Sequence, residues 1–553
     1  MNKNSSEAQI RDNSRIILGL TGLTGSGCTM LANTLAFDFV SRLKFFIDSF
    51  DESVIVRQFE GMNNLKDIQN SVPCDELLKK TNTELKQGLE NREIVNVLKR
   101  NKNILTKNNF LYISFSSMVM FFVIKHLKDS DEEMRILVEN KISQLGFTIE
   151  EAKNLVDGFT KKFHYMKVNK DKRERLIDLF SKFHLIKDEI IKIKGHSKLQ
   201  DFGDNIRNYG TPFPNNETKQ IQALVGRWLA AVVNKYIKLC QNYRYFVIEC
   251  FRNPQELYYF RERYSYFYLI AINSKKEVRL KRMEKLGLSN DKFDEIEKRE
   301  ILEDDTNICK LDVTRCIDIA DIVIQNNDNN GPDVLFRKLL RYTALILEPG
   351  SIKPSEDETL MHIAYTLSVK SNCLSRQVGA VIVNSDGYII GAGWNDVGEG
   401  QLSCGLKMGK DYKNSYLRND SLKFNLEEEN SYICIKKKLK ESQQEPDEVF
   451  CPVLHAEENA ILQLARYYGG TIKDARIYST TFPCSACFRK ISQVGIVKVI
   501  YSESYVNPLL ELYIRQSIKR IDPIPFEGVK SFSYYKLFKP YYDKKEQQLL
   551  LKK

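Results

Sequence analysis

Two short stretches near the carboxyl end of the chain place metal-binding side chains at the start of two expected helices. The first, LHAEENAILQLARYYGG (454–470), has His455 and Glu457 at the head of an apolar stripe with helical spacing. The second, TTFPCSACFRKI (480–491), has Cys484 and Cys487 at C-x-x-C spacing after Pro483. We expect these four side chains in the first turns of the two helices. Because a helix N-terminus favours thiolate over thiol, both sulfurs are suited to a metal ion.

The residue types indicate a catalytic zinc site. His455, Cys484 and Cys487 supply three ligands, which leaves a fourth zinc position for water. Glu457 lies beside the metal ligands and is expected to move a proton as general acid and base. H-x-E followed by P-C-x-x-C is the signature of zinc-dependent nucleobase deaminases. A structural zinc knot or a redox C-x-x-C is the alternative, and the complete set in this order argues against it.

Length and composition indicate a soluble protein of two or three domains. A chain of 553 residues is too long for one ordinary core, and 42% hydrophobic with 28% charged residues is typical of globular proteins. No apolar run reaches the roughly 18 residues of a membrane span, and 113–124 is expected to be a buried element.

The polar N-terminus lacks the features of a signal peptide, which predicts the cytoplasm. There, twelve cysteines indicate buried thiols and metal ligands. A net charge of +11 does not by itself indicate nucleic acid as a partner.

The N-terminal part opens with the pattern of a nucleotide-binding α/β domain. An apolar strand, RIILGLTG, runs into a glycine-rich turn and a helical stretch. GLTGSGCT (22–29) fits G-x-x-x-x-G-K-[ST], except that Cys28 stands at the lysine position. Backbone N–H groups can still bind phosphate and Thr29 can reach magnesium, but the missing charge puts phosphate transfer in doubt. The predicted nucleotide-binding residues are Gly22, Gly25, Ser26, Gly27, Cys28 and Thr29.

Further stretches look similar to P-loop nucleotide kinases. Glu249 follows a strand-like run (244–251) as an acidic metal partner would, and SKKEVRLKRMEK resembles a lid helix bearing Arg279 and Arg282. QDFGDNIRNYGTP (200–212) fits the same group. Residues 60–200 are lysine-rich with a helical pattern, and strand-like runs at 266–273 and 319–326 predict a parallel sheet.

The domain boundaries follow from these patterns. We expect a polar tail (1–14), a P-loop nucleotide-kinase-like three-layer α/β domain (15–346), a linker (347–358) and a zinc-dependent deaminase domain (359–545). The linker assignment rests on the two prolines, the glycine and the acids of LEPGSIKPSEDE.

The second domain resembles the cytidine deaminase superfamily, and within it the deoxycytidylate deaminases. The resemblance lies in SRQVGAVIV (375–383), GWND (393–396), QVGIVKVIYSESY (493–505) and the long insert before HAEENAI. It implies a cytidine-deaminase-like α/β/α fold, with Asn395 and Tyr505 as substrate contacts and Arg376 as a phosphate contact. The alternative roles are structural: Asn395 would be a turn residue, Tyr505 a packed aromatic and Arg376 a solvated arginine. For Arg376 both interpretations stay open.

Some deoxycytidylate deaminases carry a second, structural zinc, and this resemblance implies a second site at Cys373, Cys404, Cys434 and Cys451. Cys434 and Cys451 would replace histidines of that family, so the match is partial. Buried thiols without a metal are the alternative, and it stays open.

The order of the two domains resembles the bacterial anti-phage deoxycytidine-nucleotide deaminases. The resemblance implies zinc-dependent hydrolysis of dCTP and/or dCMP to the deoxyuridine nucleotide and ammonia, which would deplete nucleotides during phage infection. It also implies a homo-oligomer whose P-loop domain regulates through a nucleotide with magnesium, or through RNA. Two alternatives are a polynucleotide or tRNA base deaminase, and a nucleotide- or RNA-binding regulator with an inactive deaminase fold. The intact Glu457 argues against the last.

Overall fold

The computed structural model of the chain divides into two compact units. Unit 1 comprises Met1–Lys353 and Lys536–Lys553, and unit 2 comprises Pro354–Tyr535. The structure describes residues 15–48, 90–101, 109–160, 170–218, 227–301, 309–327, 332–413, 424–441, 451–467, 472–503, 513–514, 516 and 521–540. No helix within these ranges is long and apolar enough to cross a lipid bilayer.

Unit 1 is built on a parallel sheet with the strand order β5-β4-β1-β3-β2. Its strands are β1 (Ile16–Thr21), β2 (Leu111–Ser114), β3 (Tyr245–Glu249), β4 (Phe267–Asn273) and β5 (Ile322–Gln325). Every residue of β3 is buried, as is expected when both faces of a parallel sheet are covered. The central strand β1 has β3 on one side and β4 on the other, so connections leave it in both directions. In such sheets a crevice for ligands opens at the carboxyl end of the central strand.

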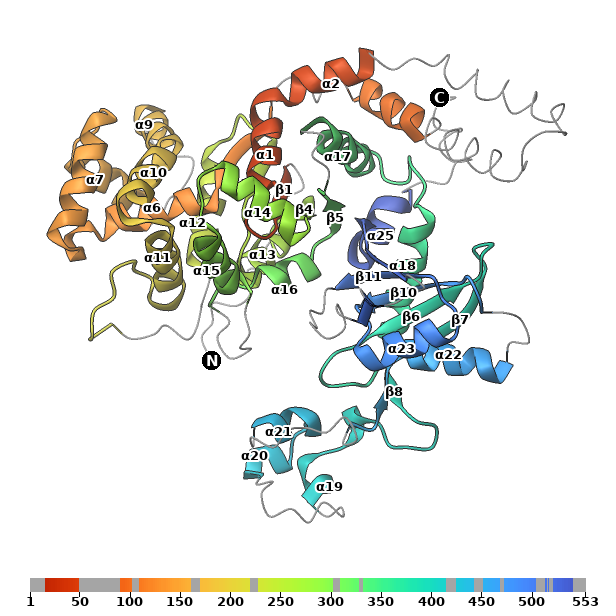
Figure 1. The fold of residues 1–553 in the computed structure, drawn as a ribbon. Helices are drawn as coiled ribbons and strands as arrows, with labels where there is room; N and C mark the ends of the chain where they lie inside the picture. The colour runs from red at the N-terminus through yellow and green to blue at the C-terminus, as the bar shows by residue number, and fades with distance from the viewer. Residues whose placement is uncertain are drawn as a thin grey trace. The chain divides into compact units, whose positions relative to one another are not determined.

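Helices α7, α9 and α10 of unit 1 lie to one side, away from the sheet (Figure 1), whereas α6 and α12 share a hydrophobic core with β1, β3 and β4. The helices of the unit are α1 (Cys28–Asn33), α2 (Phe39–Asp48), α6 (Phe115–Lys125), α7 (Glu132–Gln144), α8 (Ile149–Thr160), α9 (Lys170–Ser181), α10 (Phe183–Lys194), α11 (His196–Tyr209), α12 (Trp228–Leu239), α13 (Pro254–Arg261), α14 (Lys276–Lys285), α15 (Asn290–Glu300), α16 (Val313–Asp318) and α17 (Pro332–Leu347). A π-helical turn, Thr34–Asp38, joins α1 to α2. The strongly apolar α6 is the centre of an aromatic core, in which Phe121 packs against Phe159 and Phe180.

Unit 2 has a mixed sheet with the order β12-β11-β10-β6-β7. Its strands are β6 (Gly379–Val383), β7 (Ile389–Trp394), β10 (Arg476–Thr481), β11 (Lys498–Glu503) and β12 (Asp522–Pro525), with a separate pair of β8 (Asp396–Val397) and β9 (Val453–Leu454), and β13 (Gly528–Val529) follows β12 in the chain. Strands β10, β11 and β12 are parallel, whereas β6 is antiparallel to both β10 and β7. Unit 2 is therefore an α/β unit with a partly parallel sheet.

Helices cover both faces of this second sheet. Ala380 and Ile382 of β6 pack with α22 and α23, whereas Val381 and Val383 point to the opposite face, against α18. This alternation is what a strand between two helical layers requires. The helices are α18 (Glu356–Ser368), α19 (Gly409–Lys413), α20 (Leu426–Glu429), α21 (Ile435–Glu441), α22 (Ala456–Tyr467), α23 (Ser485–Gln493) and α25 (Ser531–Phe538).

The observed boundaries differ from the expected ones at both ends of unit 2. Helix α18 begins at Glu356, inside the expected linker, because Ser355 and Glu358 form a capping box that starts the helix there. At the other end the unit closes at Tyr535, ten residues before the expected 545, and the chain from Lys536 groups with unit 1.

Candidate functional site

Three predicted metal ligands meet in unit 2. The Nδ1 atom of His455 lies 3.3 Å from the Sγ atom of Cys484 and 3.3 Å from that of Cys487. The ligand atoms of all three residues lie within 4.8 Å of one another. Among the described residues, this is the one group of three or more histidine, cysteine or acidic side chains gathered so closely.

Two helix starts and two sheets bring these residues together. His455 directly precedes α22 and follows β9, while Cys484 is the N-cap of α23 and follows β10. We expected both residues inside the first turns, and the structure places each one position earlier. Helix α22 lies very close to β7, where a Cβ atom at Gly393 would come within 2.4 Å of the Ala456 carbonyl oxygen. Glycine at this position is therefore what allows the helix to approach the sheet.

The three donors also suit a zinc ion electrostatically. The hydrogen bond from Cys487 lowers the pKa of the Cys484 thiol to about 3, and His455 adds to the effect. The same bond, together with burial, raises the pKa of Cys487, and the bond to Cys484 raises that of His455. One imidazole nitrogen and two sulfurs are a common zinc donor set, so the residues present fit this metal.

Glu457 lies beside the three donors but is not one of them. Its side chain is buried, and burial raises the pKa of its carboxyl group. The hydroxyl of Ser479 on β10 donates to Glu457 Oε1 at 3.0 Å. Sequence reasoning missed Ser479, since only the fold brings β10 beside the start of α22. A buried carboxyl group held in one orientation is suited to proton transfer.

The predicted substrate contacts have different surroundings. Asn395 is buried, and its amide bridges the loop before β6 by donating to the Arg376 carbonyl at 2.8 Å and accepting from the Val378 N–H at 2.7 Å. The guanidinium of Arg376 is half exposed and lies 3.9 Å from the Glu503 carboxylate. Tyr505 lies outside the described residues.

The four cysteines of the expected second zinc site are all described. Burial raises the pKa of Cys404, and the charges of Cys373, Cys451 and Cys434 raise it further, so the four thiols lie within electrostatic reach of one another. Their sulfurs are not as close together as the donors around His455. The structure therefore leaves both interpretations of these cysteines in place.

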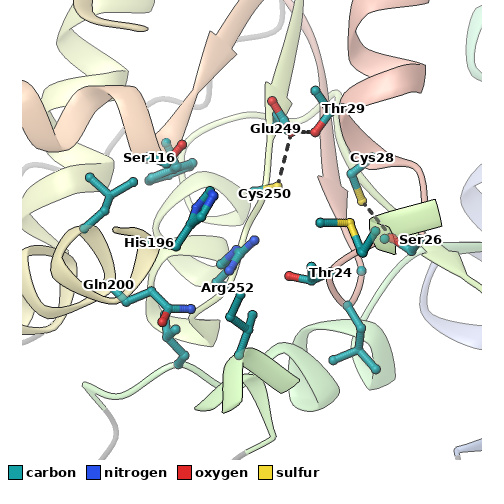
Figure 2. Close-up of a pocket in the computed structure, with 18 of the residues that line it drawn as sticks. Thr24, Ser26, Cys28, Thr29, Ser116, His196, Gln200, Glu249, Cys250 and Arg252 are labelled. Carbon is teal, nitrogen blue, oxygen red and sulfur yellow. Dashed lines mark hydrogen bonds between the residues drawn. The ribbon is translucent and has the colours of Figure 1, made fainter. Parts of the chain in front are cut away.

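In unit 1 the glycine-rich turn connects β1 to α1 at the carboxyl edge of the sheet. Gly25 and Gly27 have φ angles of 84° and 111°, the left-handed region that glycine adopts without strain. Cys28 is buried in the first turn of α1, and its sulfur lies 3.5 Å from the Ser26 hydroxyl. Thr29 donates to Glu249 at the end of β3, as Figure 2 shows. A β-hydroxyl and a carboxylate therefore adjoin the turn.

Arg279 and Arg282, the two predicted lid arginines, both donate to the backbone of the turn, and Arg282 also lines the cavity beside it. Arg279 donates to the Thr24 carbonyl at 3.2 Å and pairs with Glu297, while Arg282 donates to the carbonyls of Gly25 and Ser26 at 3.2 and 3.3 Å. Their guanidinium groups are therefore directed at backbone oxygens of the turn.

A cavity of about 500 Å³ adjoins the inner side of the turn. Among its lining residues is Arg252, which follows β3 and pairs with the buried Glu300 at 2.7 Å. Glu300 also accepts from the Thr24 N–H at 2.8 Å. Sequence reasoning missed Arg252, although its position three residues after Glu249 at a strand end was a usable signal.

Comparison with known proteins agrees with the geometry of unit 2. Residues 354–503 match the family described as the cytidine and deoxycytidylate deaminase zinc-binding region. The chain is 32% identical to the deoxycytidylate deaminase of Schizosaccharomyces pombe over 192 residues, which are 35% of this chain and 50% of that protein. It is also 32% identical to the deoxycytidylate deaminase of Enterobacteria phage T2 over 154 residues, 27% of this chain and 79% of that protein.

A solved structure, the dCMP deaminase of cyanophage S-TIM5 in apo form, is 23% identical and covers 32% of this chain and all of that one, with a TM-score of 0.21. This score is too low for a comparison of the two shapes.

The family match and the two relatives together show that unit 2 carries a zinc-binding, hydrolytic deaminase domain. The chain belongs to the deoxycytidylate deaminase family, and it spans about half the length of its fission-yeast relative.

Proposed function

We propose that the chain hydrolyses the amino group of deoxycytidine nucleotides, dCMP and/or dCTP, to give deoxyuridine nucleotides and ammonia. One observation carries the proposal. Three zinc-type donors, His455, Cys484 and Cys487, lie together, and the buried Glu457 lies two residues from the first of them without joining the set.

Each residue then has one task. His455, Cys484 and Cys487 would hold a zinc ion, and that ion would supply the Lewis acidity that makes water a nucleophile at neutral pH. Glu457 takes the proton that the attacking water loses at the ring carbon and delivers it to the departing amino nitrogen, which leaves as ammonia. Ser479 orients the Glu457 carboxyl group by donating to Oε1. Arg376, half exposed beside Glu503, is our candidate for the nucleotide phosphate.

The experiment is a substrate panel. The purified chain is incubated with dCMP, dCDP, dCTP, CTP, deoxycytidine and single-stranded oligonucleotides, and ammonia and uracil products are followed. We expect turnover of dCMP or dCTP and none of the oligonucleotides, with Glu457→Gln as the inactive control. Uracil formed in oligonucleotides at rates comparable to those for dCMP or dCTP would instead indicate a polynucleotide deaminase.

We further propose that unit 1 is a P-loop domain that regulates the deaminase. The support is the succession of strand, glycine turn and helix, together with the Thr29 hydroxyl that donates to Glu249; in this proposal the two side chains would hold magnesium beside a nucleotide. In this proposal the whole chain is a homo-oligomer that drains deoxycytidine nucleotides in anti-phage defence.

A matched pair of variants tests the regulation. A Cβ atom at Gly27 would come within 2.5 Å of Asn326 Nδ2 at a left-handed φ, whereas one at Gly158 meets nothing within 4 Å. We expect Gly27→Ala to abolish nucleotide binding by unit 1 and to change deamination in infected cells, with Gly158→Ala as the control. Unchanged deamination in cells producing folded Gly27→Ala protein would contradict regulation through the turn. Light scattering of the purified chain measures its oligomeric state.

A further inference from the structure

The cavity beside the glycine turn of unit 1 is much larger and more apolar than a phosphate group requires. Its volume is about 500 Å³, within the range of sites that enclose small organic ligands. Phe115 and Val119 of α6, Leu199 of α11 and Leu229 of α12 line it together with the turn. An inorganic phosphate would leave this apolar part unused.

One face of α11 supplies the polar groups at the far side from the turn. His196, Leu199, Gln200 and Gly203 recur at helical spacing along the cavity wall. Figure 2 shows Gln200 and His196 on one side, Thr24 and Cys28 on the other, and Arg252 between them. A ligand that fills this space has its two ends in different chemical surroundings.

Gln200 gives the strongest indication of what the ligand is. Its Oε1 atom is shielded from solvent, and it has no hydrogen-bond partner among the described residues. A buried acceptor without a partner is destabilising, which makes it a marker of an absent donor. A carboxamide presents one acceptor and one pair of donors side by side. The pairing edge of a nucleobase presents the complementary groups.

The turn side of the cavity suits the other end of a nucleotide. Backbone N–H groups of the turn and the cationic Arg252 are what a phosphate chain binds. Arg252 donates to Glu300 at 2.7 Å, and a guanidinium has five N–H donors in all.

We propose that the cavity binds the nucleoside part of a nucleotide, with the base read by the Gln200 carboxamide against Phe115 and Val119, and with the phosphates directed past Arg252 to the glycine turn. This inference rests on the proposed regulatory role of unit 1, and it identifies the regulatory ligand as a nucleotide recognised by its base.

The test uses the full chain carrying Glu457→Gln, so that nothing is deaminated. ATP, GTP and dTTP with Mg²⁺, and inorganic tripolyphosphate, are titrated calorimetrically into this protein and into the same protein with Gln200→Met or Gln144→Met. Methionine has the length of glutamine without its amide. Gln144, exposed at the end of α7, is outside the cavity and provides the matched control.

We expect at least one nucleotide to bind more tightly than tripolyphosphate. Gln200→Met should weaken that nucleotide by about tenfold or more and leave tripolyphosphate unchanged, as loss of a buried hydrogen bond does. Gln144→Met should change neither. Leu199→Trp, which fills the cavity, should also abolish nucleotide binding, and thermal melting reports whether each variant is folded.

Three results would overturn the inference: no nucleotide binds, tripolyphosphate binds as tightly as every nucleotide, or folded Gln200→Met protein binds like the control. Deamination by the chain with Glu457 intact is measured in parallel. If deamination is normal but no binding depends on the base, this inference alone is contradicted. If deamination is absent but binding depends on the base, only the proposed enzymatic function is contradicted.

Discussion

The hydroxyl of Ser479 donates to Glu457 Oε1 at 3.0 Å, and both side chains are buried. The contact holds one oxygen of this carboxyl group, in a residue two positions from the metal donor His455. We expect this serine on β10 to affect the proposed reaction through Glu457, which is 22 positions away in the chain.

We predict that Ser479→Ala lowers kcat by about tenfold or more, since a hydrogen bond to a carboxylate contributes roughly 1.5–3 kcal/mol. KM and zinc content should stay unchanged, because Ser479 is not a metal donor. The measurement is steady-state deamination beside metal analysis. Ser502→Ala, which removes a hydroxyl on β11 that bonds to Tyr365, is the matched control. An equal loss of kcat in Ser479→Ala and Ser502→Ala would show that Ser479 contributes only to packing.

The second prediction separates metal binding from proton transfer. Purified protein should hold at least one zinc per chain, and His455→Ala or Cys484→Ser should lose both this zinc and deamination, because each removes one donor of the three-residue group. Glu457→Gln should keep the zinc and lose turnover by at least about 100-fold. Metal analysis and product assays on the same preparations check this. Near-normal turnover by Glu457→Gln would show that another group moves the proton.

The zinc donors could be predicted from the sequence because their signal is local. His455, Cys484 and Cys487 each stand at a helix start, and short spacings within two segments define the set. Ser479 carried no such signal, since its partner comes from another element. The four apolar runs of unit 1 likewise indicated four of its strands, whereas β2 runs directly into the apolar helix α6 and therefore gave no separate strand pattern.

Charged residues in unit 1 show why function was harder to predict than fold. The sequence predicted that Arg279 and Arg282 lie on one helix. It did not predict the direction of their side chains, which donate to carbonyls of the turn. Gln200 lines the cavity because of how α11 packs, which no spacing in the sequence encodes, whereas Arg252 follows an expected strand and its position was a usable signal.

The third prediction concerns the support of the metal-binding helix. A Cβ atom at Gly393 would lie 2.4 Å from the Ala456 carbonyl and 2.5 Å from the Ala460 N–H, so Gly393→Ala must push α22 away from β7. We expect a loss of about 1–3 kcal/mol in the free energy of unfolding, together with weaker zinc retention. Thermal melting and metal analysis measure this. Gly398→Ala, where a Cβ atom meets nothing within 4 Å, should melt like the wild type. A Gly393→Ala protein as stable as this control would show that the close approach does not constrain the site.

The last prediction concerns the cysteine in the glycine turn. Transfer of a phosphoryl group requires positive charge near the β- and γ-phosphates, and the neutral Cys28 offers none. Arg279 and Arg282 do not replace it in this structure, because they are bonded to carbonyls of the turn. We therefore expect the wild type to hydrolyse ATP and GTP at a rate far below the roughly 1 s⁻¹ of slow kinases. Binding of both nucleotides is measured in parallel. Cys28→Lys should raise hydrolysis by about tenfold or more, and Cys28→Ala, which removes the thiol without adding charge, should not. Vigorous hydrolysis by the wild type would mean that Arg252 or another cation already serves the phosphates.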